Sequence, residues 1–332
     1  MLAYLLVSGL ASGCLYALVA VGLVVVYKST TVVNFAHGEL FMVAGFFAYT
    51  LHVLLRVPYL LAIVLAVLAS FALGMLTERL AYRPLMHAPT ISLVLAAVGF
   101  SFVLKGLARQ IWGGRGDYIP FPPLLGSDPI ILGEIVLVPQ QLVVVGGTLL
   151  SMLLFAAFFR WTRTGKTMQA TAENSKAARL VGIRVDRVYA LTWGLGAAAA
   201  AIAAVLMAPL TFVYPDIGMS LLVKAFAAAV LGGFGSLPGA ILGGLSVGVI
   251  EQLEHGPGDD QRLPVHFAPT HYRSSRKPDL PGGCTPCAFR DPQDLLHLRR
   301  PDRGRSRRAR APGAFAIAAV PCGQLRRRNR RW

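Results

Sequence analysis

Three polar residues stand at the start of an apolar run: Asn34, His37 and Glu39. Amide, imidazole and carboxylate groups can bind a metal ion or move a proton. If this turn is helical, its spacing places Asn34 and His37 on one face. A metal site needs further ligands, and the only other histidines before residue 253 are His52 and His87. We therefore predict no metal site and expect these side chains to pack against a neighbouring helix where the chain enters the membrane.

One basic residue, Lys224, lies within an apolar stretch that runs from residue 217 to 252. A charge at the centre of a transmembrane helix costs about 3 kcal/mol on insertion scales, which makes such a residue a candidate for function. Alternatively, its long side chain extends towards the membrane surface or pairs with a carbonyl of an interrupted helix. The sequence leaves both roles open.

The same stretch contains a cluster of glycines with a proline. An unbroken helix over 217–252 would be about 54 Å long, which is too long to cross a bilayer once and too short to cross it twice. Transporters build substrate sites and gates on interrupted helices. Alternatively, the four-residue spacing of Gly235, Gly239 and Gly243 serves close helix packing, and the two roles are compatible. The candidates for a helix break and translocation gate are Lys224, Gly232, Gly233, Gly235, Ser236, Pro238 and Gly239.

A basic loop lies between residues 160 and 188. Residues 166–181 lack Pro and Gly and are rich in Ala, which predicts a short surface helix that ends at Gly182. The tripeptide Gly165-Lys166-Thr167 matches the end of a phosphate-binding loop. That motif also requires Gly at position 160, where this chain has Arg. The sequence therefore has no ATP-binding loop, and any ATP dependence must come from a partner.

Apolar helices must position these residues. Of 332 residues, 55% are hydrophobic and only 14% are charged, whereas soluble domains carry roughly 25% charged residues. A bilayer core about 30 Å thick needs on the order of 20 apolar residues per span, and helices satisfy their own backbone in lipid. We predict an all-α, polytopic transmembrane helical bundle with six full spans and a Gly/Pro-broken helix pair over 217–252. The six spans are at 4–26, 39–55, 58–76, 90–108, 136–159 and 189–208.

Basic residues predict the orientation of this bundle. If the loop after the fifth span is cytoplasmic, ten Lys and Arg residues lie in inner loops. Four others, Arg56, Lys105, Arg109 and Arg115, then lie in outer loops. The N-terminus should therefore face outward.

The last 80 residues differ in composition from the rest. Residues 1–252 carry 15 basic and 9 acidic residues, a net charge of +6, whereas residues 253–332 carry 17 and 7, a net charge of +10. We predict a transmembrane domain over 1–252 and an irregular or disordered Arg/Pro-rich tail over 253–332.

Three segments together resemble the permease subunits of bacterial branched-chain amino acid ABC transporters, in particular the shorter of the two paralogous permeases. They are Val32-Val33-Asn34-Phe35-Ala36-His37-Gly38-Glu39, the segment 224–233 and the glycine block 232–244. The resemblance covers residues 1 to about 252. It implies a transport subunit of the bacterial inner membrane, not an enzyme, that passes leucine, isoleucine and valine inward from a periplasmic binding protein. Implied partners are a second permease and two ATP-binding subunits that carry ATP and Mg²⁺, so this chain would hold no cofactor.

The resemblance also assigns the basic loop to contact with the ATP-binding subunits. Lys176, Ala177, Ala178 and Gly182 match its coupling motif, although Lys176 stands where Glu is usual. Alternative functions are a permease for another amino acid, an amide or urea, or an ATP-independent secondary transporter. A secondary transporter needs intramembrane carboxylates, and here only Glu39 and Glu78 lie near span ends.

Members of this family continue into a last apolar span where this chain has its tail. One hypothesis is a frameshift near codons 252–256, which would make the tail non-native. The alternative is a genuine basic tail that binds anionic lipid or RNA. Resequencing distinguishes them, because a frameshift requires an apolar span in another reading frame. For residues 1–252 we expect contact with membrane lipid and none with nucleic acid.

Overall fold

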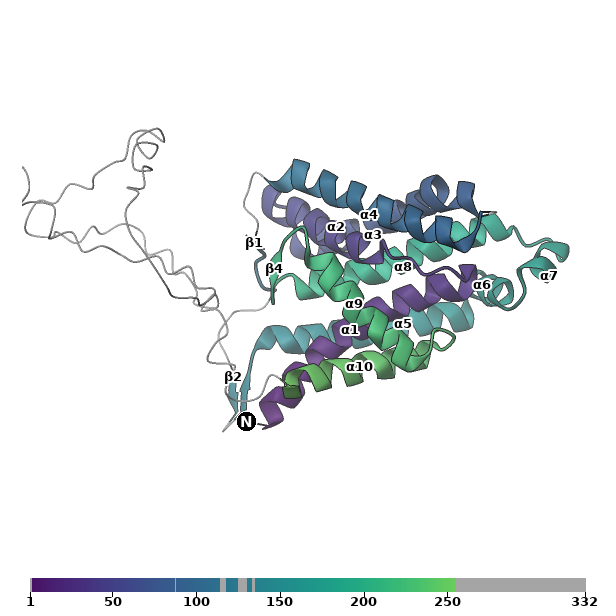
Figure 1. Ribbon diagram of the computed structural model, residues 1–332. Helices are drawn as coiled ribbons and strands as arrows, with labels where there is room; N and C mark the ends of the chain where they lie inside the picture. The colour runs from purple at the N-terminus through teal and green to yellow at the C-terminus, as the bar shows by residue number, and fades with distance from the viewer. Residues whose placement is uncertain (1, 87, 114–117, 125–129, 133–134, 255–332) are drawn as a thin grey trace, which may run out of the picture. The chain divides into compact units, whose positions relative to one another are not determined.

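A computed structural model describes residues 2–86, 88–113, 118–124, 130–132 and 135–254, and these are mostly helical (Figure 1). The predicted tail lies outside the described residues from 255 onward. The helices are α1 (Leu2–Thr30), α2 (His37–Tyr49), α3 (Tyr59–Thr77), α4 (Thr90–Trp112), α5 (Pro139–Trp161), α6 (Arg163–Glu173), α7 (Ser175–Leu180), α8 (Val185–Met207), α9 (Ile217–Gly232) and α10 (Leu237–Glu254). Short π-helical turns, η1 (Thr50–Leu54) and η2 (Glu78–Tyr82), extend α2 and α3, and the 3₁₀ turn η3 (Arg83–Leu85) follows.

Five described helices are long and apolar enough to cross a membrane: Leu5–Thr30, Tyr59–Leu85, Ile91–Trp112, Pro139–Trp161 and Val185–Met207. The predicted full span at 39–55 is not among them. The chain leaves α1 and turns back over residues 31–36 before α2 begins. Helix α2 has 13 residues and η1 extends it by five, so together they rise about 27 Å, slightly less than a bilayer core about 30 Å thick.

The helices form an inner and an outer set. In the most apolar part of α1, 89% of residues are buried, against 17% in α5. Helix α2 buries every residue except Phe47. By contrast, large apolar side chains are exposed on the outer helices, such as Leu60 on α3, Ile91 on α4 and Leu153 on α5. An exposed apolar surface of this kind suits contact with lipid.

Helices α9 and α10 are separated by residues 233–236, so the apolar stretch 217–252 is interrupted as its glycines predict. Gly233 has φ +84°, a conformation that favours glycine. Helix α10 then returns along α1, where a Cβ on Gly248 would overlap the backbone of Gly13. The close approach of α10 to α1 therefore depends on small residues.

Two pairs of short antiparallel strands accompany the helices. Strand β1 (Ile119–Pro120) pairs with β4 (Phe212–Val213), with Ile119 opposite Val213. Strand β2 (Ile130–Leu132) pairs with β3 (Ile135–Leu137), with Ile131 opposite Val136. The first pair ties the segment after α4 to the segment before α9.

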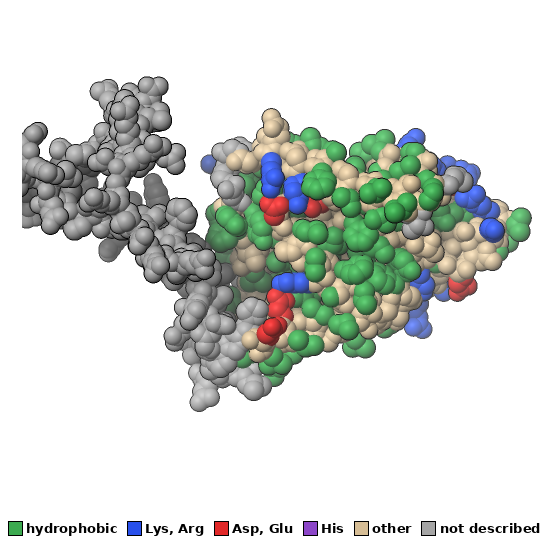
Figure 2. All heavy atoms as spheres, in the orientation of Figure 1, with side chains coloured by type: hydrophobic (Ala, Val, Ile, Leu, Met, Phe, Trp, Pro, Cys, Tyr) green, Lys and Arg blue, Asp and Glu red, His purple; other side chains and the backbone are tan. Residues whose placement is uncertain are grey.

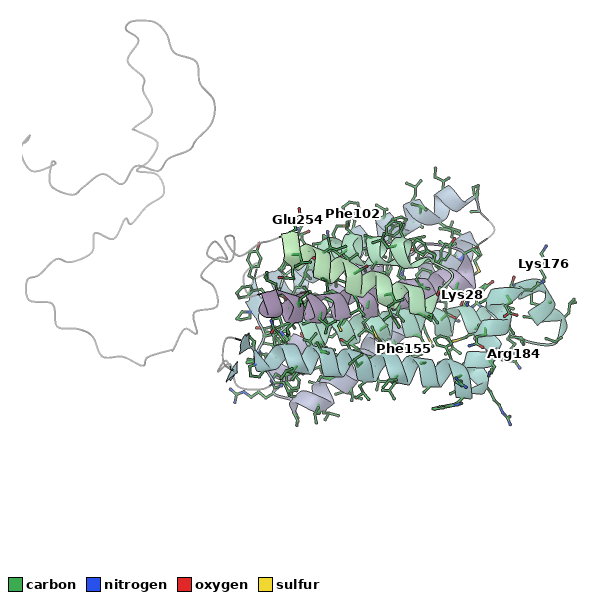
Figure 3. All side chains as sticks on the ribbon, turned by 90° about the horizontal axis from the view of Figure 1, so that it is seen from below. Lys28, Phe102, Phe155, Lys176, Arg184 and Glu254 are labelled. Carbon is green, nitrogen blue, oxygen red and sulfur yellow. The ribbon has the colours of Figure 1, made fainter. Side chains whose placement is uncertain are left out.

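Residues from three predicted inner loops share one end of the helical bundle. Lys28, Lys176 and Arg184 lie at this end, opposite Glu254 (Figure 3), and Arg83 pairs with Asp186 here. Lys and Arg side chains gather where α6 and α7 lie (Figure 2). We call this the basic end.

The assignment of Lys105 and Arg109 to an outer loop is wrong. Both lie within α4, which continues to Trp112. The apolar pattern hides this continuation, because the last turns of α4 carry charges that pair with Glu39 of α2 and with Asp216 just before α9.

Candidate functional site

The first turns of α2 and α9 meet inside the helical bundle. A Cβ on Gly38 would overlap the carbonyl of Gly218, and a Cβ on Gly218 would overlap that of Gly38. Both glycines are therefore required for this backbone contact. Because α2 begins at His37 and α9 at Ile217, the approach brings together two helix N-termini, where the backbone carries a partial positive charge.

The position of His37 beside α1 shows how deep in the helical bundle α2 begins. Its side chain is fully buried, and a Cβ on Gly22 would lie 2.9 Å from its Nε2 atom. Gly22 precedes the end of α1 by eight residues, which is about 12 Å along the helix. The start of α2 thus lies inside the helical bundle, below the basic end.

Asn34 holds the turn that leads into α2. Its Oδ1 atom accepts hydrogen bonds from the backbone N–H of Ala36, at 2.9 Å, and from the Tyr82 hydroxyl, at 3.1 Å. The Tyr82 ring packs against Trp193 of α8, with centroids 4.0 Å apart. Asn34 therefore contacts a neighbouring helical segment, and its oxygen is engaged in positioning the turn.

Glu39 belongs to a charged cluster with Lys105, Arg109 and Asp216. Lys105 Nζ lies 3.5 Å from Glu39 Oε1 and 3.0 Å from Asp216 Oδ1, and Arg109 Nη2 lies 2.8 Å from Asp216 Oδ2. Glu39 is only 3% exposed, and its Oε2 has no hydrogen-bond partner among the described residues. The two acids stand at the starts of α2 and α9, where the helix dipoles also stabilise negative charge.

Asp216 lies between β4 and α9, outside the helices. A hydrogen bond from Lys105 holds the pKa of its carboxyl below the ordinary value, and the nearby charges of Lys105 and Arg109 act in the same direction against partial burial. Asp216 therefore stays charged at neutral pH.

Lys224 of α9 has a partner that sequence reasoning missed. Its ammonium forms an ion pair with Glu251 of α10 and donates to the Tyr16 hydroxyl of α1 at 3.1 Å. Lys224 and Glu251 are the only charged residues between 217 and 252, so their opposite signs were an available signal. The ion pair offsets the desolvation free energy of the half-buried lysine ammonium.

The glycines of the helix break have different surroundings. A Cβ on Gly239 would overlap the carbonyl of Gly232, and one on Gly243 would overlap the Ala228 carbonyl, so both permit α9 and α10 to touch. By contrast, nothing lies within 4 Å of a Cβ on Gly235. Ser236 accepts a hydrogen bond from the Gly239 N–H at 3.1 Å and so caps α10.

Pro238 lies in the first turn of α10, where proline removes no helical hydrogen bond. Together with the Ser236 cap, it specifies where the second half of the broken pair starts.

The predicted single helix over 166–181 is wrong, because the chain breaks at Asn174 into α6 and α7. The Asn174 side chain accepts from the Ala177 N–H at 3.0 Å, which starts a new helix. The predicted helix end is confirmed, since Gly182 has φ +84°. Leu180 and Val181 beside it are 89% and 77% exposed. Lys176 and Ala177 are also exposed, whereas Ala178 is buried.

The structure thus brings the predicted residues together in three places. Asn34, His37 and Glu39 surround the start of α2; the residues of the glycine block join α9 to α10; and the coupling motif lies in α7 and directly after it, at the basic end. Figure 2 shows groups of basic and acidic side chains on a face that is otherwise largely hydrophobic. The members that sequence reasoning missed are Lys105, Arg109, Asp216 and Glu251.

Sequence comparison assigns the chain to a known protein family. The family described as the permease component of the branched-chain amino acid transport system matches residues 5–256. The chain belongs to this family. The resemblance inferred from its motifs is therefore confirmed, and the permease is a multi-pass membrane protein.

Several named proteins are similar in sequence to this permease. The high-affinity branched-chain amino acid transport system permease protein LivH of Salmonella typhimurium is 37% identical, over 74% of this permease and 83% of that protein. BraD of Pseudomonas aeruginosa, which bears the same description, is 37% identical over 74% and 84%. The autoinducer 2 import system permease protein LsrC of Salmonella paratyphi B is 29% identical over 57% and 52%.

Proposed function

We propose that this permease is the membrane-spanning subunit of an ATP-driven importer in the bacterial inner membrane. Its substrates are leucine, isoleucine and valine, delivered by a periplasmic binding protein. The observation that carries the proposal is the 37% identity to LivH over 83% of that protein. ATP and Mg²⁺ bind to two partner subunits, a second permease completes the membrane part, and this chain holds no cofactor and does not hydrolyse ATP.

The substrate path runs beside the starts of α2 and α9. Buried helix starts support this role, because transporters place substrate groups at the ends of discontinuous helices. The charged cluster of Glu39, Lys105 and Asp216 supplies both signs of charge there, as a zwitterionic amino acid requires. The broken pair α9–α10, with Lys224 midway along α9, is the element that moves.

Uptake by the assembled transporter tests this function. The permease, its partner permease, the ATP-binding subunits and the binding protein are reconstituted in vesicles, and labelled leucine uptake is measured with and without ATP. We expect ATP-dependent uptake that unlabelled isoleucine and valine inhibit. Uptake without ATP would instead establish a secondary transporter.

A substitution at the helix junction tests the path. Gly38→Ala adds a methyl group that collides with Gly218, whereas Gly99→Ala on α4 adds one to open space. We expect Gly38→Ala to reduce uptake at least tenfold in assembled complexes and Gly99→Ala to leave it unchanged. Equal uptake by the two variants would place the path elsewhere.

A different small polar solute is the second candidate substrate. The relative LsrC is named as an autoinducer 2 import permease, so related chains carry names that refer to other solutes. Inhibition of uptake by a panel of amino acids, amides and urea separates these substrates.

A further inference from the structure

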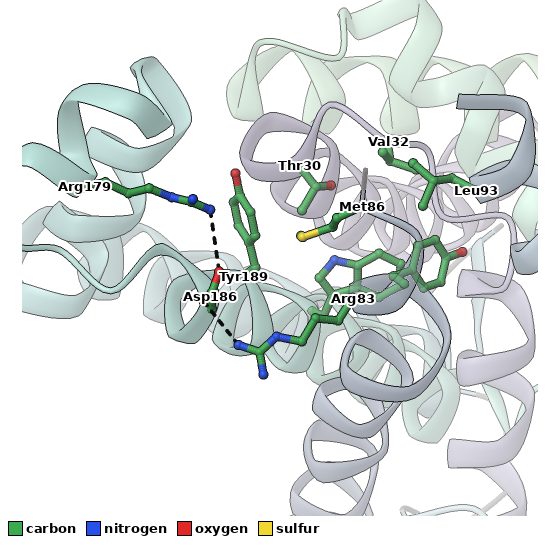
Figure 4. Close-up of a pocket in the computed structure, with 10 residues that line it drawn as sticks. Thr30, Val32, Arg83, Met86, Leu93, Arg179, Asp186 and Tyr189 are labelled. Carbon is green, nitrogen blue, oxygen red and sulfur yellow. Dashed lines mark ion pairs between the residues drawn. The ribbon is translucent and has the colours of Figure 1, made fainter. Parts of the chain in front are cut away.

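A pocket of about 350 Å³ opens at the basic end, apart from the charged cluster and the helix break. The end of α1, the turn η3, the start of α4, helix α7 and the start of α8 contribute to it (Figure 4). Three of its lining residues are charged (Arg83, Arg179 and Asp186) and three are apolar (Val32, Met86 and Leu93). Neither the helix break nor the predicted coupling motif accounts for this combination.

The charged side of the pocket is held by two weak ion pairs. Arg83 Nη2 lies 3.5 Å from Asp186 Oδ2, and Arg179 Nη2 lies 3.6 Å from Asp186 Oδ1. Figure 4 shows both guanidinium groups directed at this one carboxylate. All three side chains are exposed by more than two-fifths, so the pairs contribute little stability and can open for a ligand. Two arginines on one aspartate leave an excess of one positive charge.

The deeper wall of the pocket includes Trp193. This residue is 1% exposed, and its indole N–H has no hydrogen-bond partner among the described residues. A buried donor without an acceptor costs about 1–3 kcal/mol, and an acceptor can relieve that cost only if the ring shifts towards the pocket, because the N–H has almost no accessible surface. Tyr189 supplies a further polar group to the lining.

We propose that this pocket binds a free amino acid with an aliphatic side chain. The α-carboxylate pairs with Arg83 or Arg179, because a planar guanidinium binds carboxylate through two hydrogen bonds. Asp186 takes the α-ammonium, and the side chain lies against Val32, Met86 and Leu93. A phosphate ion fits less well, since it would face the Asp186 carboxylate and leave the apolar wall without a contact.

The position of the pocket gives this binding a consequence. Arg179 belongs to α7, and Asp186 to the first turn of α8. A ligand on Arg179 and Asp186 replaces their direct contact and so shifts α7, the helix that the family resemblance assigns to contact with the ATP-binding subunits. We expect the transported amino acid, once it accumulates at the basic end, to slow its own uptake. This inference rests on the proposed function for the identity of the amino acid and for the ATP-binding partner.

Binding to the full chain tests the pocket directly. The permease alone, in lipid nanodiscs without binding protein or ATP, is titrated with leucine while its tryptophan fluorescence is recorded. We expect a saturable change that Trp193→Phe abolishes, and at least tenfold weaker binding in Asp186→Asn. Arg160→Gln, a charge change at the exposed end of α5 that does not line the pocket, should bind as the wild type does.

Two results would overturn the inference: Asp186→Asn binding leucine as tightly as the wild type, or no leucine binding at all, whether or not phosphate binds. Leu93→Trp, which fills the pocket, provides a second variant if Asp186→Asn fails to fold, and it should bind at least tenfold more weakly. Leucine uptake by the assembled transporter is measured in parallel. If the transporter takes up leucine normally but the pocket does not bind leucine, this inference alone is refuted. If the transporter does not take up leucine, the proposed function is refuted.

Discussion

Lys224 and Glu251 form an ion pair across the break that separates α9 from α10. Both side chains are partly buried, at 39% and 24% exposure. Lys224→Met leaves the Glu251 carboxylate without the lysine, whereas Lys224→Met combined with Glu251→Gln removes both charges. Loss of one partner of a buried pair costs more than loss of both. We therefore expect the single variant to unfold at a lower temperature than the double variant.

Thermal unfolding of the purified permease in detergent measures this difference. A double variant that unfolds at the same temperature as Lys224→Met would show that the pair does not couple the two helices. Tyr16→Phe, which keeps the ion pair and removes one hydrogen bond, should have a smaller effect than either.

The contact between Gly232 and Gly239 gives a second prediction. Gly239→Ala places a methyl group against the Gly232 carbonyl, so α9 and α10 must separate. Overpacking of this kind costs about 1–3 kcal/mol. We expect a lower unfolding temperature and reduced uptake. Gly146→Ala on α5, where nothing lies within 4 Å of the new Cβ, should be neutral, and equal stability of the two variants would contradict the packing role.

Apolar runs and glycine positions predicted much of this fold. Five long helices, the interruption after Gly232 and the helix end at Gly182 follow from local chemistry. The helix predicted at 39–55 is present as α2 and η1 over 37–54, but it is not among the five helices that are long and apolar enough to cross a membrane, because its buried start carries His37 and Glu39. The break at Asn174 was missed because the Ala-rich composition favoured one helix.

The charged cluster of Glu39, Lys105, Arg109 and Asp216 could not be predicted from the sequence. Lys105 contacts Glu39 and Asp216, which are 66 and 111 residues away along the chain. No periodic pattern encodes such pairs, because only the packing of α2, α4 and α9 brings them together. A basic residue counted towards membrane orientation was therefore a partner of two acids.

Asp216 gives a prediction about pH. Because the hydrogen bond from Lys105 lowers the pKa of Asp216, the folded state binds a proton at this site less readily than the unfolded chain does. Its contribution to stability is present at and above the ordinary pKa of aspartate and is lost only as pH falls through the lowered value. We expect amide exchange in the first turn of α9 to show the same protection from about pH 8 to about pH 5. Asp216→Asn should reduce this protection throughout, and protection that falls in the wild type between those values would contradict the lowered pKa.

The exposed tip of α7 gives the last prediction. Leu180 and Val181 are 89% and 77% exposed at the basic end, beyond the predicted membrane spans, where an apolar pair suits a protein contact better than water. The double variant Leu180→Ser/Val181→Ser should leave the unfolding temperature of the permease unchanged, because these side chains make few contacts within the chain. It should weaken co-purification of the ATP-binding subunits at least tenfold. Leu55→Ser, which alters a 64% exposed leucine between η1 and α3, is the matched control and should retain them. Retention of the ATP-binding subunits by the double variant would show that they dock elsewhere.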